Sequence, residues 1–268
     1  MPGFLQKHIS FLLNRDPFFV AFWDGLGKEG QLVALERLSE IDLVARSRFP
    51  GLGKLHSNAD DITRRFFVVV QEEEFQYTRI PRHWVEFVRD KPAKEGLFSN
   101  SLSELERFLR SYEFDREIRL YGGIKPDESI DRKYGIAKKR GGMQKINDLW
   151  DVVRFRMVAE SISDVRSIAV RLWMSYFENV VRCRNYYFRP KNGDGNDPYR
   201  AVHFELEIFP RKLIEIQVMT RSRELLCYLD YAPHFKGHTP FTSWRQRRWL
   251  THFSQKANVY DCQKIIKF

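Results

Sequence analysis

The stretch PYRAVHFELEIFPRKLIEIQVM, residues 198–219, contains two runs in which apolar and polar side chains alternate strictly. Alternation with a period of two is typical of a β-strand that buries one of its faces. Pro210 and Arg211 separate the two runs and favour a turn. We therefore predict two strands, at 200–208 and 213–219, that pair as a hairpin.

The polar side of this hairpin carries the first candidate site residues. Glu215 and Gln217 alternate with apolar residues in the second strand, as His203 and Glu205 do in the first. In a paired hairpin, Glu215 shares a face with His203, Glu205 and Tyr199, so a carboxylate lies beside an imidazole and an aromatic ring. A Glu or His at such a position is more often a solvated or structural side chain than a site residue, so the pattern alone leaves both interpretations open.

The segments before the hairpin predict strands and helices in turn. DVVRFRMV, residues 151–158, is typical of a strand, and the segment after it repeats apolar residues at helical spacing behind a predicted cap at Ser163 and Asp164. Ser101 or Ser103 would cap an earlier helix. This order predicts the α/β class, as a mixed α+β fold in which helices flank a mixed sheet.

The chain divides into three predicted regions. Residues 1–100 form an N-terminal, mainly helical extension whose role the sequence does not reveal, and 101–240 form the main domain. The Gly and Pro residues at 122–129 mark a break between elements within it. Residues 241–268 form a basic, aromatic C-terminal segment.

A second carboxylate, Asp151, opens the strand predicted at 151–158. In nucleotide sites Mg²⁺ typically uses one or two protein carboxylates together with substrate phosphates. Asp151 and Glu215 are therefore a candidate Mg²⁺ pair. The basic run at 132–145 would suit a polyphosphate, although such a run is also typical of a solvated helix.

The composition describes a folded chain with an excess of positive charge. Of the 268 residues 43% are hydrophobic, and the net charge is +10, which favours polyanionic partners such as nucleotides or RNA. Charged residues interrupt the apolar N-terminus before a signal peptide or membrane span can form. Three widely spaced cysteines predict neither a disulfide framework nor a zinc site. We expect a cytoplasmic protein that does not enter a membrane.

Four motifs taken together resemble the synthetase domain of the RelA/SpoT family of alarmone synthetases. They are YGIAKK (134–139), DVVRFRMV (151–158), PYRAVHFELE (198–207) and IEIQVMTRSREL (214–225), in this order. The resemblance implies a RelA/SpoT nucleotidyltransferase-like mixed sheet flanked by helices. It also implies a pyrophosphokinase that transfers pyrophosphate from ATP to a ribose 3′-hydroxyl, most often that of GDP or GTP, to make (p)ppGpp-type alarmones.

The same resemblance implies roles for the residues that match these motifs. Asp151 would hold Mg²⁺ at the ATP phosphates, and Glu215 would bind that ion or remove the proton of the ribose hydroxyl. Tyr199 would stack on the acceptor base, with His203 and Gln217 supporting the acceptor pocket. Contacts to ATP or its phosphates would come from Lys138, Lys139, Arg154 and Arg156.

The sequence departs from the family pattern mainly around the expected acceptor site. Pro198 and Arg154 each stand where a Gly is usual, and Asn185 stands where an Asp is usual. The loop before Pro198 is lengthened by GDGND, and Tyr231 replaces an expected His. These departures leave the identity of the acceptor open.

Other interpretations remain open beside GDP or GTP modification. A toxin-like branch of the family makes adenosine alarmones or modifies the 3′ end of tRNA. The charge of residues 236–268, with seven basic residues and one acidic residue, is compatible with a tRNA substrate. In one interpretation this segment binds RNA through three arginines that are interleaved with tryptophans, Arg245, Arg247 and Arg248. In the other, it is a terminal helix that packs its tryptophans on the core. An antitoxin partner would accompany a toxin. A different class is a catalytically inactive regulator that binds nucleotide or RNA.

Overall fold

The computed structural model describes residues 87–139 without 88 and 115, 151–187, 199–209 and 212–231. It also describes isolated positions between residues 10 and 35, and residues 254, 257 and 261. Most of the predicted N-terminal extension, the turn at 210–211 and the three arginines Arg245, Arg247 and Arg248 lie outside the described residues. Within the described part, no helix combines the length and the apolar character that crossing a membrane requires.

Helices and strands alternate over residues 91–175, and three strands then follow in succession before the last helix of the series. Their order is α6 (Lys91–Arg110), β1 (Arg119–Ile124), α7 (Asp127–Lys139), β2 (Val153–Ala159), α8 (Ile162–Ser175), the 3-10 helix η2 (Phe177–Asn179), β3 (Val180–Asn185), β4 (Val202–Phe209), β5 (Lys212–Thr220) and α9 (Arg221–Tyr231).

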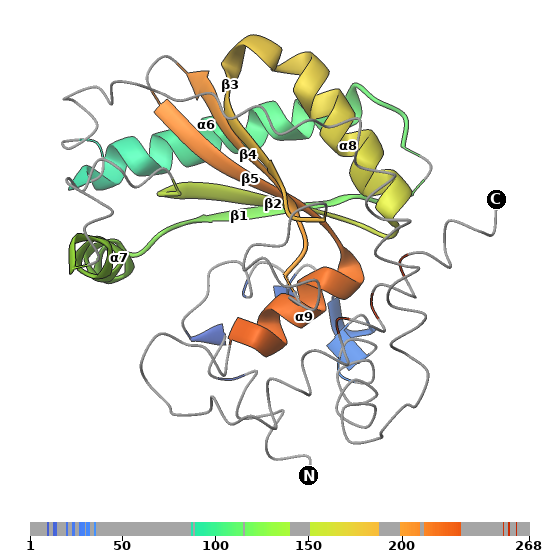
Figure 1. Ribbon diagram of the computed structural model, residues 1–268, viewed down its shortest axis with the longest axis horizontal. Coiled ribbons are helices and arrows are strands. Elements are labelled where there is room, and N and C mark those ends of the chain that lie inside the picture. The colour runs from blue at the N-terminus through green and yellow to red at the C-terminus, as the bar shows by residue number, and fades with distance from the viewer. Residues whose placement is uncertain are drawn as a thin grey trace.

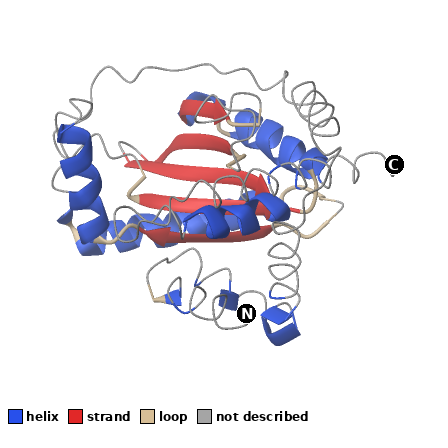
Figure 2. Cartoon of the chain, turned by 60° about the horizontal axis from the view of Figure 1, so that its bottom comes forward, coloured by secondary structure: helices blue, strands red, loops and turns tan. Residues whose placement is uncertain are grey.

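The five strands form one mixed sheet in the order β1-β2-β5-β4-β3 (Figures 1 and 2). Strands β2 and β5 are parallel, and the other neighbours are antiparallel. The predicted hairpin is present as β4 and β5, with Glu205 directly opposite Glu215 and His203 opposite Gln217. The predicted fold class, a mixed sheet flanked by helices, is confirmed.

The two faces of the sheet differ in character. Alternate residues of the central strands, among them Phe155, Phe204 and Ile216, are fully buried in the hydrophobic core. Helices α6 and α8 cover this face and contribute Leu105 and Leu172 to the core. In Figure 1, α9 lies on the other side of the sheet from α6 and α8. The apolar face therefore holds the domain together, while the intervening residues face α9.

Both predicted helix starts are wrong in position. The N-cap of α8 is Ser161, not Ser163: its side chain accepts a hydrogen bond from the Asp164 backbone, and the Asp164 side chain accepts one from the Ser161 backbone. Helix α6 begins at Lys91 behind the N-cap Asp90, so Ser101 and Ser103 lie inside the helix. Asp90 was missed because several polar residues upstream of an apolar repeat have the same capping chemistry. Helix α6 consequently runs across residues 100 and 101, the predicted boundary of the main domain.

Strand β1 occupies part of the segment that was predicted to be a break. Gly122 and Gly123 lie within it, paired with Phe155 and Arg154 of β2. A Cβ atom on Gly122 would lie 2.5 Å from the ring of Phe155 and 2.6 Å from the carbonyl oxygen of Arg154. The glycine therefore permits a close approach between the strands instead of ending one.

Candidate active site

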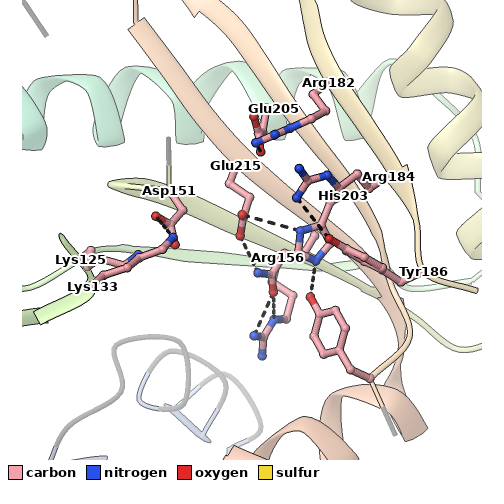
Figure 3. Close-up of polar contacts among 12 residues, drawn as sticks. Lys125, Lys133, Asp151, Arg156, Arg182, Arg184, Tyr186, His203, Glu205 and Glu215 are labelled. Atoms are coloured by element: carbon pink, nitrogen blue, oxygen red, sulfur yellow. Dashed lines mark hydrogen bonds and ion pairs between the residues drawn. The ribbon is translucent and has the colours of Figure 1, made fainter. Parts of the chain in front are cut away.

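The candidate site lies on the polar face of the sheet. The register places Arg154 opposite Glu215 and Arg156 opposite Gln217 across β2 and β5, and His203 of β4 opposite Gln217. Directly opposed residues point to the same face, so side chains from three adjacent strands gather there. In Figure 3, Glu215 and Arg156 lie between a group around Asp151 and a group around His203.

The first group is a carboxylate held by two lysines. Asp151 precedes β2, and its carboxylate accepts hydrogen bonds from Lys125, which follows β1, and from Lys133 of α7, the latter at 2.8 Å. Asp151 and Lys125 are largely buried, whereas Lys133 is partly exposed. Burial alone would raise the pKa of Asp151, but the positive charges of Lys125 and Lys133 outweigh it and hold this pKa below its usual range. Asp151 is therefore ionised, in a basic environment suited to phosphate.

The second group surrounds Glu215. One carboxylate oxygen accepts a hydrogen bond of 2.6 Å from the Gln217 amide, and the other lies 3.6 Å from Nδ1 of His203. Burial would raise the pKa of Glu215, but the charge and hydrogen bond of His203 lower it to about 2. The negative charge of Asp151 acts on the pKa of Glu215 in the opposite sense and raises it.

Gln217 links Glu215 to Arg156. Its side-chain oxygen accepts hydrogen bonds from Nε and Nη2 of Arg156, at 3.2 and 3.1 Å, while its nitrogen donates to Glu215. Arg156 also lies over the ring of Tyr121, 5.9 Å from its centroid, and is 3.9 Å from Glu224 of α9. Its guanidinium is therefore oriented from three sides.

A group of aromatic side chains borders the site on the side of Glu215 that is remote from Asp151 (Figure 3). The Tyr199 hydroxyl and Nε2 of His203 share a hydrogen bond. The ring of Tyr186, which follows β3, stands edge-on to His203 at 4.9 Å and to Tyr199 at 5.8 Å between centroids. Tyr199, His203 and Glu215 therefore form a continuous polar line that starts where the loop enters β4.

Seven of the predicted site residues come together on this face. They are Asp151, Arg154, Arg156, Tyr199, His203, Glu215 and Gln217. Lys138 and Lys139 belong to the end of α7, but their side chains lie outside the described residues. The predicted sharing of a face by Glu215, Tyr199, His203 and Glu205 is consistent with the register and contacts.

The sequence analysis missed several residues that the structure brings to the site. Lys125 and Lys133 contact Asp151, Tyr186 contacts His203, and Arg182 pairs with Glu205 beside the Glu215 group. Lys133 lay within the basic run that was noted, but nothing in the run distinguishes it from its neighbours. Tyr186 precedes the long loop, so only the pairing of β3 with β4 brings its ring into contact with His203.

The donors at the site fit Mg²⁺. The lowered pKa values of Asp151 and Glu215 keep both carboxylates deprotonated, as metal ligands must be. Among the described residues no group of three or more His, Cys, Asp or Glu side chains could enclose a metal ion. Two carboxylates with the remaining positions left for phosphates and water are what Mg²⁺ typically uses in nucleotide sites.

Known proteins resemble this chain in structure but not detectably in sequence. No protein-family model and no curated protein sequence matches the chain. Among solved structures, the small alarmone synthetase 1 of Bacillus subtilis, bound to its product pppGpp, matches with a TM-score of 0.52 and 19% identity, over 70% of this chain and 97% of that one. A GTP pyrophosphokinase family protein of Streptococcus pneumoniae matches with a TM-score of 0.53 and 18% identity, over 69% of this chain and 93% of that one.

These likenesses establish the fold. The chain has the fold of the small alarmone synthetases, which is the mixed-sheet architecture that the four sequence motifs predicted.

Proposed function

We propose that the protein is a pyrophosphokinase, which transfers the terminal pyrophosphate of ATP to a ribose 3′-hydroxyl. The observation that carries this proposal is the pair of ionised carboxylates, Asp151 and Glu215, that share one polar sheet face with lysines and arginines. Moving a pyrophosphoryl group requires neutralisation of phosphate charge, positioning and help in deprotonating a hydroxyl. The alarmone synthetase fold supports the same reaction class.

The donor side of the reaction belongs to the Asp151 group. Asp151 and Glu215 would hold Mg²⁺, which supplies charge neutralisation at the transferred phosphates. Lys125 and Lys133 already surround Asp151, so phosphate oxygens placed there would meet two lysine side chains. Burial lowers the pKa of Lys125 to about 7, and phosphate charge beside it would favour its protonated form. Arg154 and Arg156 project from β2 onto the same face and would contact ATP.

The acceptor side belongs to Glu215 and the aromatic group. Glu215 would accept the proton of the 3′-hydroxyl, directly or while bound to the metal, and His203 and Gln217 hold its two oxygens in place. Tyr199 would stack on the acceptor base while its hydroxyl is fixed by His203. GDP or GTP is the proposed acceptor, as in the family that the sequence resembles.

The 3′ end of tRNA is the second candidate acceptor, and the charge of the C-terminal segment favours it. Residues 236–268 carry seven basic residues and a single acidic one, Asp261. Asp261 is fully buried and pairs with Arg223 of α9. A segment of this charge would bind an RNA backbone.

A transfer assay tests the reaction and its acceptor together. ATP labelled at the terminal phosphate is offered with Mg²⁺ to GDP, GTP, ADP and deacylated tRNA in parallel, with Glu215→Ala as the inactive control. Label on GDP or GTP in the wild type alone supports alarmone synthesis, and label only on tRNA supports a translation-blocking toxin that would need an antitoxin. Absence of label on every acceptor would overturn the proposal and favour a nucleotide-binding or RNA-binding regulator.

The tRNA alternative has its own test. Replacement of Arg245, Arg247 and Arg248 by Gln should weaken tRNA binding and flatten its salt dependence, because each phosphate contact releases counterions. Unchanged tRNA affinity in this triple variant would refute RNA binding by the segment.

A further inference from the structure

A largely buried polar network ties residues 254 and 261 to the start of α9. Asp261 accepts hydrogen bonds from the hydroxyls of Thr220, at 3.2 Å, and Ser222. Its carboxylate also lies 3.4 Å from Nε of Arg223, and neither of these two side chains is exposed to solvent. Nη1 of Arg223 donates a hydrogen bond of 3.0 Å to Ser254.

Two residues near the C-terminus, Ser254 and Asp261, make this contact. Ser254, Ala257 and Asp261 are each helical and buried, and their spacing of three and four residues is typical of one helix face. We refer to these three residues as the C-terminal anchor. Asp261 follows Thr220 by 41 residues, so the anchor closes a long stretch of chain onto the junction of β5 and α9.

The anchor is joined to α9 by a buried charge pair, Asp261 with Arg223. A buried charge is tolerated when it is paired and hydrogen-bonded, and removal of one partner leaves the other uncompensated. Asp261 has hydrogen bonds from two hydroxyls as well as an ion pair, so the carboxylate that faces Arg223 is fixed by several contacts at once. Ser254 accepts a further hydrogen bond from Arg223.

The next residue of α9, Glu224, carries the connection into the candidate site. Successive residues of a helix point about 100° apart, so Arg223 and Glu224 face different neighbours. Glu224 is fully buried, and its carboxylate lies 3.9 Å from Nη1 of Arg156. Within the described part of the chain, neither carboxyl oxygen of Glu224 has a hydrogen-bond partner. Burial raises the pKa of Glu224 well above its usual range, while the positive charge of Arg119 acts in the opposite sense. Arg156 in turn binds Gln217, which binds Glu215.

We propose that the C-terminal anchor positions Arg156 for nucleotide binding by fixing the first turn of α9, which presents Glu224 to Arg156. Asp261 and Glu224 are thus positioning residues that act through another side chain. The inference rests on the proposed function in one respect, namely that Arg156 contacts the ATP donor. It makes the C-terminal segment part of the catalytic domain.

The test compares the affinities of the two substrates in the full chain. Asp261→Asn keeps the shape of the side chain but removes the charge that faces Arg223. We expect this variant to bind a non-hydrolysable ATP analogue with Mg²⁺ about tenfold more weakly, in line with couplings of this kind, while GDP affinity stays within about twofold. Glu224→Ala removes the carboxyl group that lies beside Arg156 and should give the same selective loss. Isothermal titration calorimetry at a temperature where each variant is folded measures both affinities.

A matched control separates positioning from loss of stability. Ser161→Ala removes the capping hydrogen bonds of α8, on the opposite face of the sheet, and should lower the melting temperature while leaving both affinities at the wild-type level. If Asp261→Asn does not fold, Ser222→Ala removes a single hydrogen bond to Asp261 and should give a smaller loss of ATP-analogue affinity in the same direction.

These affinity measurements test positioning by the anchor separately from the proposed pyrophosphokinase activity. Unchanged ATP-analogue affinity in the folded anchor variant, or an equal loss in Ser161→Ala, would overturn positioning by the anchor. A selective loss in Asp261→Asn without one in Glu224→Ala would overturn the route through Glu224. If the wild type binds the analogue but transfers no pyrophosphate, the proposed pyrophosphokinase activity is refuted. The affinities of the variants then still test whether the anchor positions Arg156. A wild type that binds no nucleotide would overturn both.

Discussion

The two faces of the central sheet are made by alternate residues of the same strands, yet they have opposite physical requirements. Ile216 on one face of β5 is fully buried among apolar side chains, while its neighbour Glu215 on the other face is an ionised carboxylate held by His203 and Gln217. The apolar face requires volume and shape, because its stability comes from burial and close packing. The polar face requires charges at fixed positions, because each buried charge must have partners.

Because of this difference, substitutions of adjacent residues should impair different properties of the protein, either its stability or its activity. A change on the apolar face lowers the free energy of unfolding and leaves the chemistry of the folded molecules intact. A change on the polar face removes chemistry from molecules that remain folded. The neighbours Glu215 and Ile216 give the sharpest comparison, because they differ by one position in the same strand.

The largest expected effect is on the polar face. Glu215→Gln keeps the side-chain volume but removes the carboxylate, so pyrophosphate transfer should fall by about a thousandfold, within the range typical of a lost general base. Initial rates measured at saturating ATP and acceptor, with circular dichroism to confirm folding, check this prediction. Glu207→Gln on the adjacent strand β4 is the matched control and should retain activity. Equal activity in the two variants would exclude Glu215 from the reaction.

The corresponding change on the apolar face should act on stability alone. Ile216→Ala leaves a cavity in the core and should lower the free energy of unfolding by about 2–5 kcal/mol. Urea denaturation measures this loss, and transfer activity per folded molecule should remain at the wild-type level. A large loss of activity in fully folded Ile216→Ala would show that the two faces are not independent.

The polar face should also make a contribution to stability that depends on pH. Folding lowers the pKa of Glu215 from an ordinary value of 4.5 to about 2, which corresponds to about 3 kcal/mol of stability at neutral pH. A carboxyl group with a lowered pKa stabilises the fold fully above its unfolded pKa, and this contribution disappears as the pH falls through the folded pKa.

Chemical denaturation of the wild type and Glu215→Gln, in the presence of a chelator, measures this contribution. The difference in unfolding free energy between the two proteins should shrink by about 2 kcal/mol between about pH 7 and about pH 3. A difference that stays constant over this interval would show that the carboxylate is not stabilised by the fold.

The division between the two faces also explains what the sequence could reveal. The alternation at 198–219 predicted the hairpin and the shared face of Glu215, His203 and Tyr199, because a period of two fixes which residues point together. It did not predict Lys125 as a partner of Asp151. The two residues are 26 positions apart, and only the pairing of β1 with β2 brings them into contact.

Contacts made by fold topology are invisible to a local pattern. Tyr186 and His203 meet because β3 pairs with β4 across the intervening loop, and Asp261 meets Arg223 because the chain returns to α9. The basic run at 132–145 is helical over its described part, but its pattern does not distinguish a lysine that faces Asp151 from one that faces solvent.

Strand β1 was missed for a different reason, and it leads to the smallest predicted effect. Gly122 was interpreted as a breaker, whereas its missing side chain makes room for Phe155, whose ring stacks on Phe98 of α6 at 5.3 Å between centroids. Gly122→Ala should force the ring or the strand to shift and lower the free energy of unfolding by about 1–3 kcal/mol. The matched variant Gly96→Ala adds the same methyl group where no atom lies within 4 Å, inside α6, and should be neutral or stabilising by up to about 1 kcal/mol.

Urea denaturation of both variants checks whether the close approach at Gly122 is required. Because Gly122 lies on the apolar face, its substitution should leave the affinity for nucleotides unchanged in folded molecules, even though Gly123, the next residue, is paired with Arg154 on the polar face. A stability of Gly122→Ala equal to that of Gly96→Ala would mean that β1 accommodates the methyl group. In that case the apolar face is packed more loosely at β1, on the edge of the sheet, than at the central strands. Close packing of side chains would then be required at β2, β4 and β5 but not at β1.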